Sequence, residues 1–166
     1  SGGIGTFAVQ LATHVGCEVT GVCSTRNVDL VRSLGVDRVV DYTTTDVTET
    51  GETYDVIFDA VGKGSFAGVA DALNPGGLYM TTVPSVGVLL AMARTRLVGD
   101  RRAVFAATGM KPVGVRRRYL GELRTLLDSG DIRSVIGRRY PVREIVEAHR
   151  YVDTGHKRGT AVVTID

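Results

Sequence analysis

The first twelve residues, SGGIGTFAVQLA (1–12), decide the fold class of this chain. Gly2, Gly3 and Gly5 open a segment whose apolar residues recur at helical spacing and stop at Gly16. Glycine lets the backbone turn sharply and lets a pyrophosphate approach with no Cβ in the way. The following helix N-terminus adds free N–H groups and a partial positive charge. The stretch predicts a phosphate-binding turn, with an ordinary tight turn as the alternative.

The position of the turn within its motif predicts that a strand is missing. In the G-x-G-x-x-G pattern, Ser1 is the first x, Gly2 the second glycine, and Gly5 the third. The third glycine would allow the helix to pack closely on the sheet. The first glycine, and the buried strand that leads into such a turn, would both precede Ser1. We therefore expect the chain to begin inside the motif and to lack the first strand of its sheet.

Strand-like and helix-like segments alternate beyond the turn, which is typical of an α/β fold with a doubly wound parallel (Rossmann) sheet. The predicted strands lie at 18–23, 37–42, 54–62, 78–83 and 102–109. The predicted helices lie at 28–34, about 65–73, 86–97 and 119–130, with a turn at 74–77. This region, 1–130, is the predicted cofactor-binding domain.

The pattern changes in the tail, 131–166. A strand ending at Pro141, a short helix with Ile145, Ala148 and Val152 facing inward, and a closing strand at 159–165 are expected. This strand-helix-strand tail need not belong to the same sheet.

Composition excludes several classes of function. The 166 residues are 43% hydrophobic and 23% charged, with a net charge of +2, too weak to indicate a nucleic-acid or anionic membrane surface. No apolar run approaches the roughly 20 residues of a membrane span, and no signal peptide is visible. Cys17 and Cys23 are expected to be buried, reduced thiols, which fits the cytoplasm. The three histidines form no recognisable catalytic constellation or metal site, so the catalytic residues are not assigned.

The end of the second predicted strand indicates which nicotinamide cofactor fits. NAD sites usually place a carboxylate there for the ribose 2′-OH. This chain has Ser24, with Arg26 just beyond, so a hydroxyl and a guanidinium are available for a 2′-phosphate. The pattern favours NADP(H). The alternative is a solvated Arg26, with Ser24 or Asn27 capping a helix.

Two further strand ends are expected to lie over the cofactor. Val61 and Gly62 end the strand predicted at 54–62, and Thr82 and Val83 hold the equivalent place on the next strand. Asp59 could cap a turn or helix there or contact the cofactor.

Five segments together resemble the medium-chain dehydrogenase/reductase superfamily, in particular its zinc-independent, quinone-oxidoreductase-like branch. They are SGGIGTFAVQLA (1–12), GVCSTRNVDLVRSLGVDRVVDY (21–42), YDVIFDAVG (54–62), LNPGGLYMTT (73–82) and EAHRYVDTGHKRGTAVVTI (147–165).

The resemblance implies NADPH-dependent hydride transfer to a quinone, enone or related carbonyl compound. It places Gly2, Gly3, Ile4 and Gly5 at the pyrophosphate, and Ser24, Arg26 and Tyr42 near the 2′-phosphate. Tyr42 could equally be a half-buried tyrosine at a strand end.

The resemblance also implies a catalytic domain preceding this chain, to which the tail returns. Any zinc ligands of relatives would lie in that domain. Half of the walls of the active site would lie there too, so this chain alone should be inactive. The chain departs from many relatives at Thr160, where they have lysine or asparagine.

Two other classes remain open. A class I S-adenosylmethionine-dependent methyltransferase shares the pattern of 54–62 and 73–82, although Cys23 and Ser24 replace its usual acidic residue. The second class is a non-catalytic relative that binds a nucleotide or a partner protein.

Assembly is predicted from the sheet edges. Without a strand before Ser1, the strands at 18–23 and 54–62 lack their shared neighbour, and we expect the gap to be filled. Relatives pair the edge corresponding to 102–108 across a two-fold axis. This edge has no proline and carries charges only at Arg101 and Arg102, so nothing in the sequence blunts it. A homodimer through 102–108 is expected, with apolar side chains of the tail left exposed.

Overall fold

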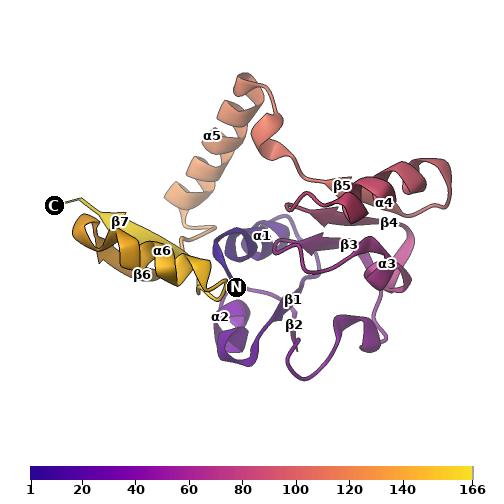
Figure 1. Cartoon of the computed structure of the whole chain (residues 1–166), viewed down its shortest axis with the longest axis horizontal. Coiled ribbons are helices and arrows are strands. Elements are labelled where there is room, and N and C mark those ends of the chain that lie inside the picture. The colour runs from indigo at the N-terminus through magenta and orange to yellow at the C-terminus, as the bar shows by residue number, and fades with distance from the viewer. Residues whose placement is uncertain (166) are drawn as a thin grey trace. The chain divides into compact units, whose positions relative to one another are not determined.

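The computed structural model describes residues 1–165 (Figure 1). The chain packs into two units: residues 1–45 with 120–166, and residues 46–119. These bounds differ from the predicted division into a cofactor-binding domain, 1–130, and a tail, 131–166. That division is one of functional parts, and it stays a prediction.

The first unit contains the helices and strands of both chain ends. They are α1 (Gly3–His14), β1 (Thr20–Cys23), α2 (Val28–Arg32), β2 (Arg38–Asp41), most of α5 (Val113–Ser129), β6 (Ile136–Pro141), α6 (Ile145–Asp153) and β7 (Thr160–Thr164). The second unit holds the middle of the chain. Its elements are β3 (Tyr54–Asp59), α3 (Phe66–Val69), β4 (Leu73–Thr81), α4 (Val86–Leu97), β5 (Arg102–Phe105) and the start of α5.

All strand pairs within residues 1–165 are parallel, which confirms the predicted fold class. β1 pairs with β2, β3 and β5 flank β4, and β6 pairs with β7. β1 and β3, the strands expected to lack a shared neighbour, belong to different sheets.

The core of the first unit forms where α2 packs on β1. Leu30, Val31 and Cys23 are buried there. A Cβ on Gly21 would lie 2.5 Å from Cγ1 of Val31, so only glycine allows the helix this close. The Asp37 carboxylate accepts a hydrogen bond from the Val19 amide at 2.7 Å and fixes the start of the strand pair.

The core of the second unit is centred on Tyr79. Leu73, Tyr79, Val88 and Ala103 are buried together, and the Phe66 ring meets Tyr79 edge-on at 6.4 Å between centroids. The core therefore joins β4, α4 and β5, and it supports the loops that follow β3 and β4.

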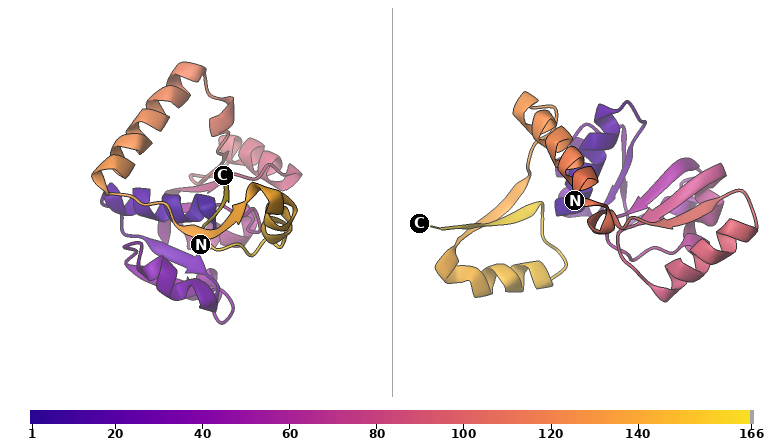
Figure 2. Two further views of the ribbon diagram at one scale, coloured as in Figure 1. Left: turned by 90° about the vertical axis from the view of Figure 1, so that its left-hand side faces the viewer. Right: turned by 90° about the horizontal axis from the view of Figure 1, so that it is seen from above.

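The tail is anchored to α1 through a buried amide. Oε1 of Gln10 accepts from the Arg133 amide at 2.9 Å, and Nε2 donates to the Arg133 carbonyl at 3.1 Å. Beyond this anchor, α6 runs along one face of the β6–β7 pair (Figure 2). A buried glutamine that pairs with a peptide unit therefore ties the tail to α1 with both of its polar atoms satisfied.

The buried face of α1 differs from the expectation of an apolar one. Its buried side chains are Thr6 and Gln10, whereas Ile4 and Val15 are 54% and 71% exposed. Polar side chains can be buried here because backbone groups that lie close in space satisfy their hydrogen bonds, as the Arg133 peptide unit does for Gln10. Gly5 has no described atom within 4 Å of its Cβ position, so the expected close packing at this glycine is not found.

Other local predictions need correction. Cys17 is exposed, and only Cys23 is a buried thiol. The helix expected at 65–73 is short, α3 followed by a single 3-10 turn. The segment 74–77 belongs to β4, where the pairing register with β3 shifts around it. In α6, only Ala148 of the three expected inward residues is buried, because Ile145 and Val152 are both 39% exposed.

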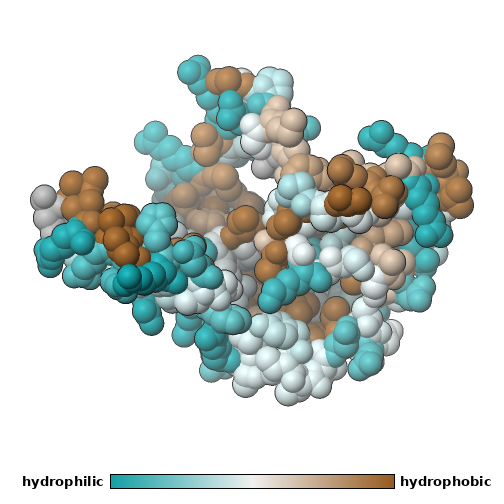
Figure 3. All heavy atoms as spheres, viewed as in Figure 1, coloured by the Kyte–Doolittle hydropathy of each residue, from teal (hydrophilic) through white to brown (hydrophobic). Residues whose placement is uncertain are grey.

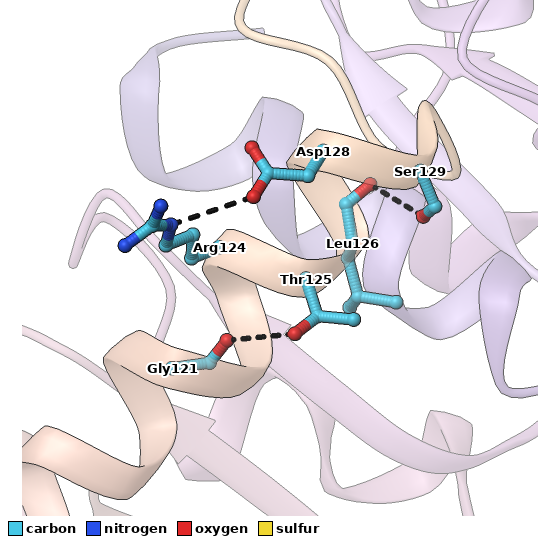
Figure 4. Close-up of polar contacts among 6 residues, drawn as sticks. All are labelled: Gly121, Arg124, Thr125, Leu126, Asp128 and Ser129. Carbon is cyan, nitrogen blue, oxygen red and sulfur yellow. Dashed lines mark hydrogen bonds and ion pairs between the residues drawn. The ribbon is translucent and has the colours of Figure 1, made fainter.

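Apolar side chains are exposed on several elements, as Figure 3 shows over α4 and the tail. In the tail, Ile136 and Val163 are exposed, which confirms that part of the prediction. On α5 the exposed surface is partly polar: Arg124 pairs with Asp128 at 3.4 Å, and Thr125 bonds back to Gly121 (Figure 4). Exposed pairs of this kind contribute little stability.

Candidate functional site

The glycine turn before α1 is open to a ligand. Gly2 precedes the helix in an extended conformation, and its carbonyl accepts from the Thr6 amide at 2.9 Å. A Cβ on Gly2 or Gly5 would have no described atom within 4 Å. The first turn of α1 contains no acidic residue. At Gly3, the first residue of α1, side-chain atoms of Lys157 and Thr160 lie 3.2 and 3.4 Å from the Cβ position. An anion therefore has room at Gly2 and Gly5, where the free N–H groups of the helix start would bind it.

A hollow of about 260 Å³ lies beside this turn within the first unit. It is lined by Ser24, Thr25, Arg26, Tyr42 and His156. The ends of β1 and β2 are joined there, because the Tyr42 amide donates to the Cys23 carbonyl at 3.0 Å. Ser24, Arg26 and Tyr42, all predicted from the sequence, therefore come together. Tyr42 is 57% exposed, so a half-buried tyrosine at the strand end stays an alternative to a binding role.

Arg26 retains most of its hydrogen-bonding capacity. One guanidinium N–H group donates to the His156 carbonyl at 2.9 Å. Within residues 1–165, no carboxylate lies at ion-pair distance from Arg26. A guanidinium has five N–H donors, so several remain for a phosphate.

Asn27 joins the hollow to the glycine turn. Ser24 and Asn27 stand at the N-cap positions of the 3-10 turn Thr25–Asn27 and of α2, but neither side chain makes a capping hydrogen bond. Asn27 is buried, and its Nδ2 donates to the hydroxyls of Ser1 at 3.0 Å and Ser24 at 3.3 Å. Its Oδ1 has no hydrogen-bond partner among the described residues. This contact holds the end of β1 next to the start of α1.

Sequence reasoning missed three residues beside the hollow. The Thr25 and Thr43 hydroxyls lie 2.8 Å apart, and Asp41 accepts from the Thr43 hydroxyl at 2.7 Å. Hydrogen bonds from Thr25 and then Thr43 lower the pKa of Asp41, so its carboxylate is stabilised in the ionised form. The run DYTTT (41–45) is the only signal, since Asp and Thr at a strand end favour such turns.

His156 was also missed, because its place in the hollow depends on the tail. The loop between α6 and β7 brings it to the end of β1, more than a hundred residues away in sequence. Local pattern gives no signal for such a contact.

The second unit presents the other predicted strand ends on two adjacent loops. A Cβ on Gly62 would lie 2.5 Å from that of Val83, and the Thr82 hydroxyl donates to the Ala60 carbonyl at 3.4 Å. Val61, Gly62, Thr82 and Val83 are thus brought together as expected. Val61 is 66% exposed and Val83 38% exposed, so both can meet a ligand.

Asp59 resolves the choice left open by the sequence, because it caps the turn after β3. Its carboxylate accepts from the amides of Val61, Gly62 and Gly64 at 2.7–2.9 Å, and from the Tyr79 hydroxyl at 3.1 Å. Burial opposes ionisation of Asp59, but these donors hold its pKa below the ordinary value. Burial and the Asp59 charge raise the pKa of Tyr79 to about 12. The network fixes the loop that carries Val61 and Gly62.

No group of three or more His, Cys, Asp or Glu side chains in residues 1–165 is arranged to hold a metal ion. No helix in that range is long and apolar enough to cross a membrane.

Comparison with known proteins identifies the family. Residues 34–163, most of the chain, match the family model described as zinc-binding dehydrogenase. The chain belongs to this family. The described part of this zinc-binding dehydrogenase chain offers no ligand cluster for zinc, so we derive no step through a metal.

Similar proteins agree with the predicted quinone-oxidoreductase-like branch. Mitochondrial NAD(P)H oxidoreductase RTN4IP1 of Mus musculus is 36% identical over 99% of this chain and 46% of its own length. Chloroplastic quinone-oxidoreductase QR1 of Triphysaria versicolor is 30% identical over 98% of this chain and 50% of its own length. The quinone oxidoreductase from Coxiella burnetii superposes with a TM-score of 0.81 at 27% identity, covering 99% of this chain and 50% of that one.

These matches confirm the resemblance to the medium-chain superfamily and do not favour the methyltransferase alternative. This dehydrogenase chain spans about half the length of the curated relatives it matches.

Proposed function

We propose that this chain is the NADP(H)-binding portion of an oxidoreductase that transfers hydride to a quinone, enone or related carbonyl compound. The observation that carries the proposal is the hollow at the end of β1, where Arg26 has no carboxylate partner among residues 1–165. It adjoins an open glycine turn at a helix N-terminus. The two features fit the 2′-phosphate and the pyrophosphate of one dinucleotide.

The residues present divide the work of binding. Gly2, Gly3, Ile4 and Gly5 would hold the pyrophosphate through backbone N–H groups, while Ser24, Arg26 and Tyr42 would hold the adenosine ribose and its 2′-phosphate. That Val61, Gly62, Thr82 and Val83 also contact the cofactor remains a prediction from the sequence. When bound, the nicotinamide supplies the hydride. The residues of this chain bind and orient the cofactor, and we assign the catalytic residues to the preceding domain.

NADPH is expected to be preferred over NADH. Names of relatives support a nicotinamide cofactor, and one solved Escherichia coli quinone oxidoreductase of the same fold is described as complexed with NADPH. No carboxylate within residues 1–165 lies at ion-pair distance from Arg26, which favours the phosphorylated form. The cytoplasm stays a prediction, because two relatives are named as mitochondrial and chloroplastic.

Arg26→Ala is expected to weaken NADPH selectively. Loss of one charge-assisted contact costs about 1.5–3 kcal/mol, about ten-fold to a hundred-fold in Kd, and Kd for NADH should stay within about two-fold. Titration calorimetry with both cofactors on the full-length enzyme measures this. Arg32→Ala is the matched control, because Arg32 is an exposed arginine on α2 whose described ion pair is with Asp29. Equal losses for NADH and NADPH would contradict the assignment of Arg26.

The homodimer through 102–108 remains our proposal, with one correction. The Ala103 amide donates to the Thr95 hydroxyl at 3.2 Å, and Arg102 bonds to the Thr95 carbonyl. α4 therefore covers part of the β5 edge, whereas the sequence predicted an edge with nothing to hinder its pairing with another strand. Sedimentation equilibrium is expected to show a dimer that Phe105→Pro separates, because proline cannot donate to a partner strand. A monomeric wild-type protein would refute this.

A further inference from the structure

The loop that joins α6 to β7 lies directly on the glycine turn. The Gly159 amide donates to the Ser1 carbonyl at 2.9 Å, and Gly2 and Gly159 form an isolated parallel bridge. The N-terminus and this loop are side by side in Figure 1. The loop, residues 155–159, contains His156, Lys157 and Arg158 and no acidic residue. We call it the tail loop.

Lys157 is the residue of the tail loop that reaches the turn. Its Nζ lies 3.2 Å from where a Cβ on Gly3 would be, and it donates to the Gly159 carbonyl at 3.2 Å. This carbonyl uses one of the three donors of the ammonium group. Within residues 1–165, no carboxylate lies at ion-pair distance from Lys157.

The electrostatics of this arrangement are unfavourable without an anion. The N-terminus of α1 carries a partial positive charge, and the first turn of the helix has no acidic residue. An ammonium group beside it adds a second positive charge. A diphosphate in the open space at Gly2 would neutralise both.

We propose that Lys157 is a binding residue for the pyrophosphate of the dinucleotide, supplied by the tail and acting on NADH and NADPH alike. This rests on the proposed function. Two cations from distant segments then serve two different phosphate groups: Arg26 the 2′-phosphate, and Lys157 the pyrophosphate. Arg26 also donates to the His156 carbonyl at 2.9 Å, so the tail loop contacts both ends of the phosphate-binding region.

A consequence is that cofactor binding stabilises the docking of the tail. The pyrophosphate would bridge the start of α1 and Lys157, adding to the contacts of Gly159. The tail loop should therefore exchange its amide protons more slowly when either cofactor is bound.

The test uses four probes on the full-length enzyme: NADPH, NADH, ADP-ribose and 2′-AMP. ADP-ribose carries the pyrophosphate without a 2′-phosphate, whereas 2′-AMP carries the 2′-phosphate alone. Lys157→Ala is expected to raise Kd about ten-fold for NADPH, NADH and ADP-ribose and to leave 2′-AMP within about two-fold. Arg26→Ala should give the complementary pattern, weakening NADPH and 2′-AMP only.

Two further variants separate charge from loop structure. Lys157→Gln keeps a donor that can reach the Gly159 carbonyl but removes the charge, and we expect it to behave like Lys157→Ala. Arg158→Ala is the matched control, because Arg158 is exposed in the same loop and its described contact, to the Tyr151 hydroxyl, is made by its backbone amide. It should change no Kd by more than about two-fold.

Three outcomes would overturn the proposal. One is wild-type affinity of Lys157→Gln for ADP-ribose and NADH. Another is an equal loss for 2′-AMP, which would indicate that the tail loop had collapsed. The third is wild-type enzyme that binds none of the four probes, which would overturn the proposed function itself. A selective Arg26→Ala effect beside an inert Lys157→Gln would leave the proposed function standing and remove only the role of Lys157.

Discussion

Gly62→Ala is expected to lower the free energy of unfolding by about 2–5 kcal/mol, the sum of two separate costs. Gly62 has a φ of 76°, which L side chains rarely adopt, and its added Cβ would lie 2.5 Å from the Cβ of Val83. The loop cannot relieve the contact easily, because the Asp59 carboxylate holds the Gly62 amide at 2.7 Å. Urea denaturation followed by circular dichroism measures the effect.

A matched control isolates the contact with Val83. Gly51 has nearly the same φ, 75°, but no described atom lies within 4 Å of its Cβ position. Gly51→Ala should therefore carry only the backbone cost of about 1–2 kcal/mol. Val83→Ala is expected to recover part of the Gly62→Ala loss in a double-mutant cycle. Equal effects of Gly51→Ala and Gly62→Ala on the free energy of unfolding would show that the loop of Gly62 does not contact the loop of Val83.

Asp59→Ala is expected to destabilise the chain by about 3 kcal/mol, because it leaves four donors without their acceptor. Water can replace the carboxylate at the exposed amides. It cannot easily reach the hydroxyl of Tyr79, which is 1% exposed. We also expect weaker binding of both cofactors, since this network fixes the loop of Val61 and Gly62. Thermal unfolding and cofactor titration measure the two effects.

The same network makes a signed pH prediction. The folded pKa of Asp59 is lowered, so its contribution to stability is present above about pH 4 and is lost as pH falls through the folded pKa. The pKa of Tyr79 is raised to about 12, so its contribution is complete below about pH 10 and is lost as pH rises to about 12. Asp59→Asn should flatten the acid side of the stability profile and Tyr79→Phe the alkaline side. Asp71→Asn, at an exposed carboxylate of the same unit, is the control. A wild-type acid profile in Asp59→Asn would contradict this account.

Local pattern was enough for the fold class and for half of the candidate site. The glycine turn, the alternation of strands with helices, and Ser24 and Arg26 at a strand end are all readable within short windows. These features depend on backbone conformation and on side-chain periodicity, which neighbouring residues set.

The sequence alone determined less about which side chains are buried. The polar residues Thr6 and Gln10, not the apolar Ile4 and Val15, form the buried side of α1. Burial of Gln10 is favourable only because the Arg133 peptide unit satisfies its amide, and that partner comes from 123 residues away.

Only the tertiary structure decided the remaining parts of the site. The cap at Asp59 needed Tyr79 from the next strand, and the Thr25–Thr43–Asp41 cluster needed β1 beside β2. His156 and Lys157 reached the hollow and the glycine turn through a loop at the far end of the chain. Contacts of this kind follow from the docking of whole elements, which sums many weak interactions across long sequence separations. No short window of sequence contains that sum.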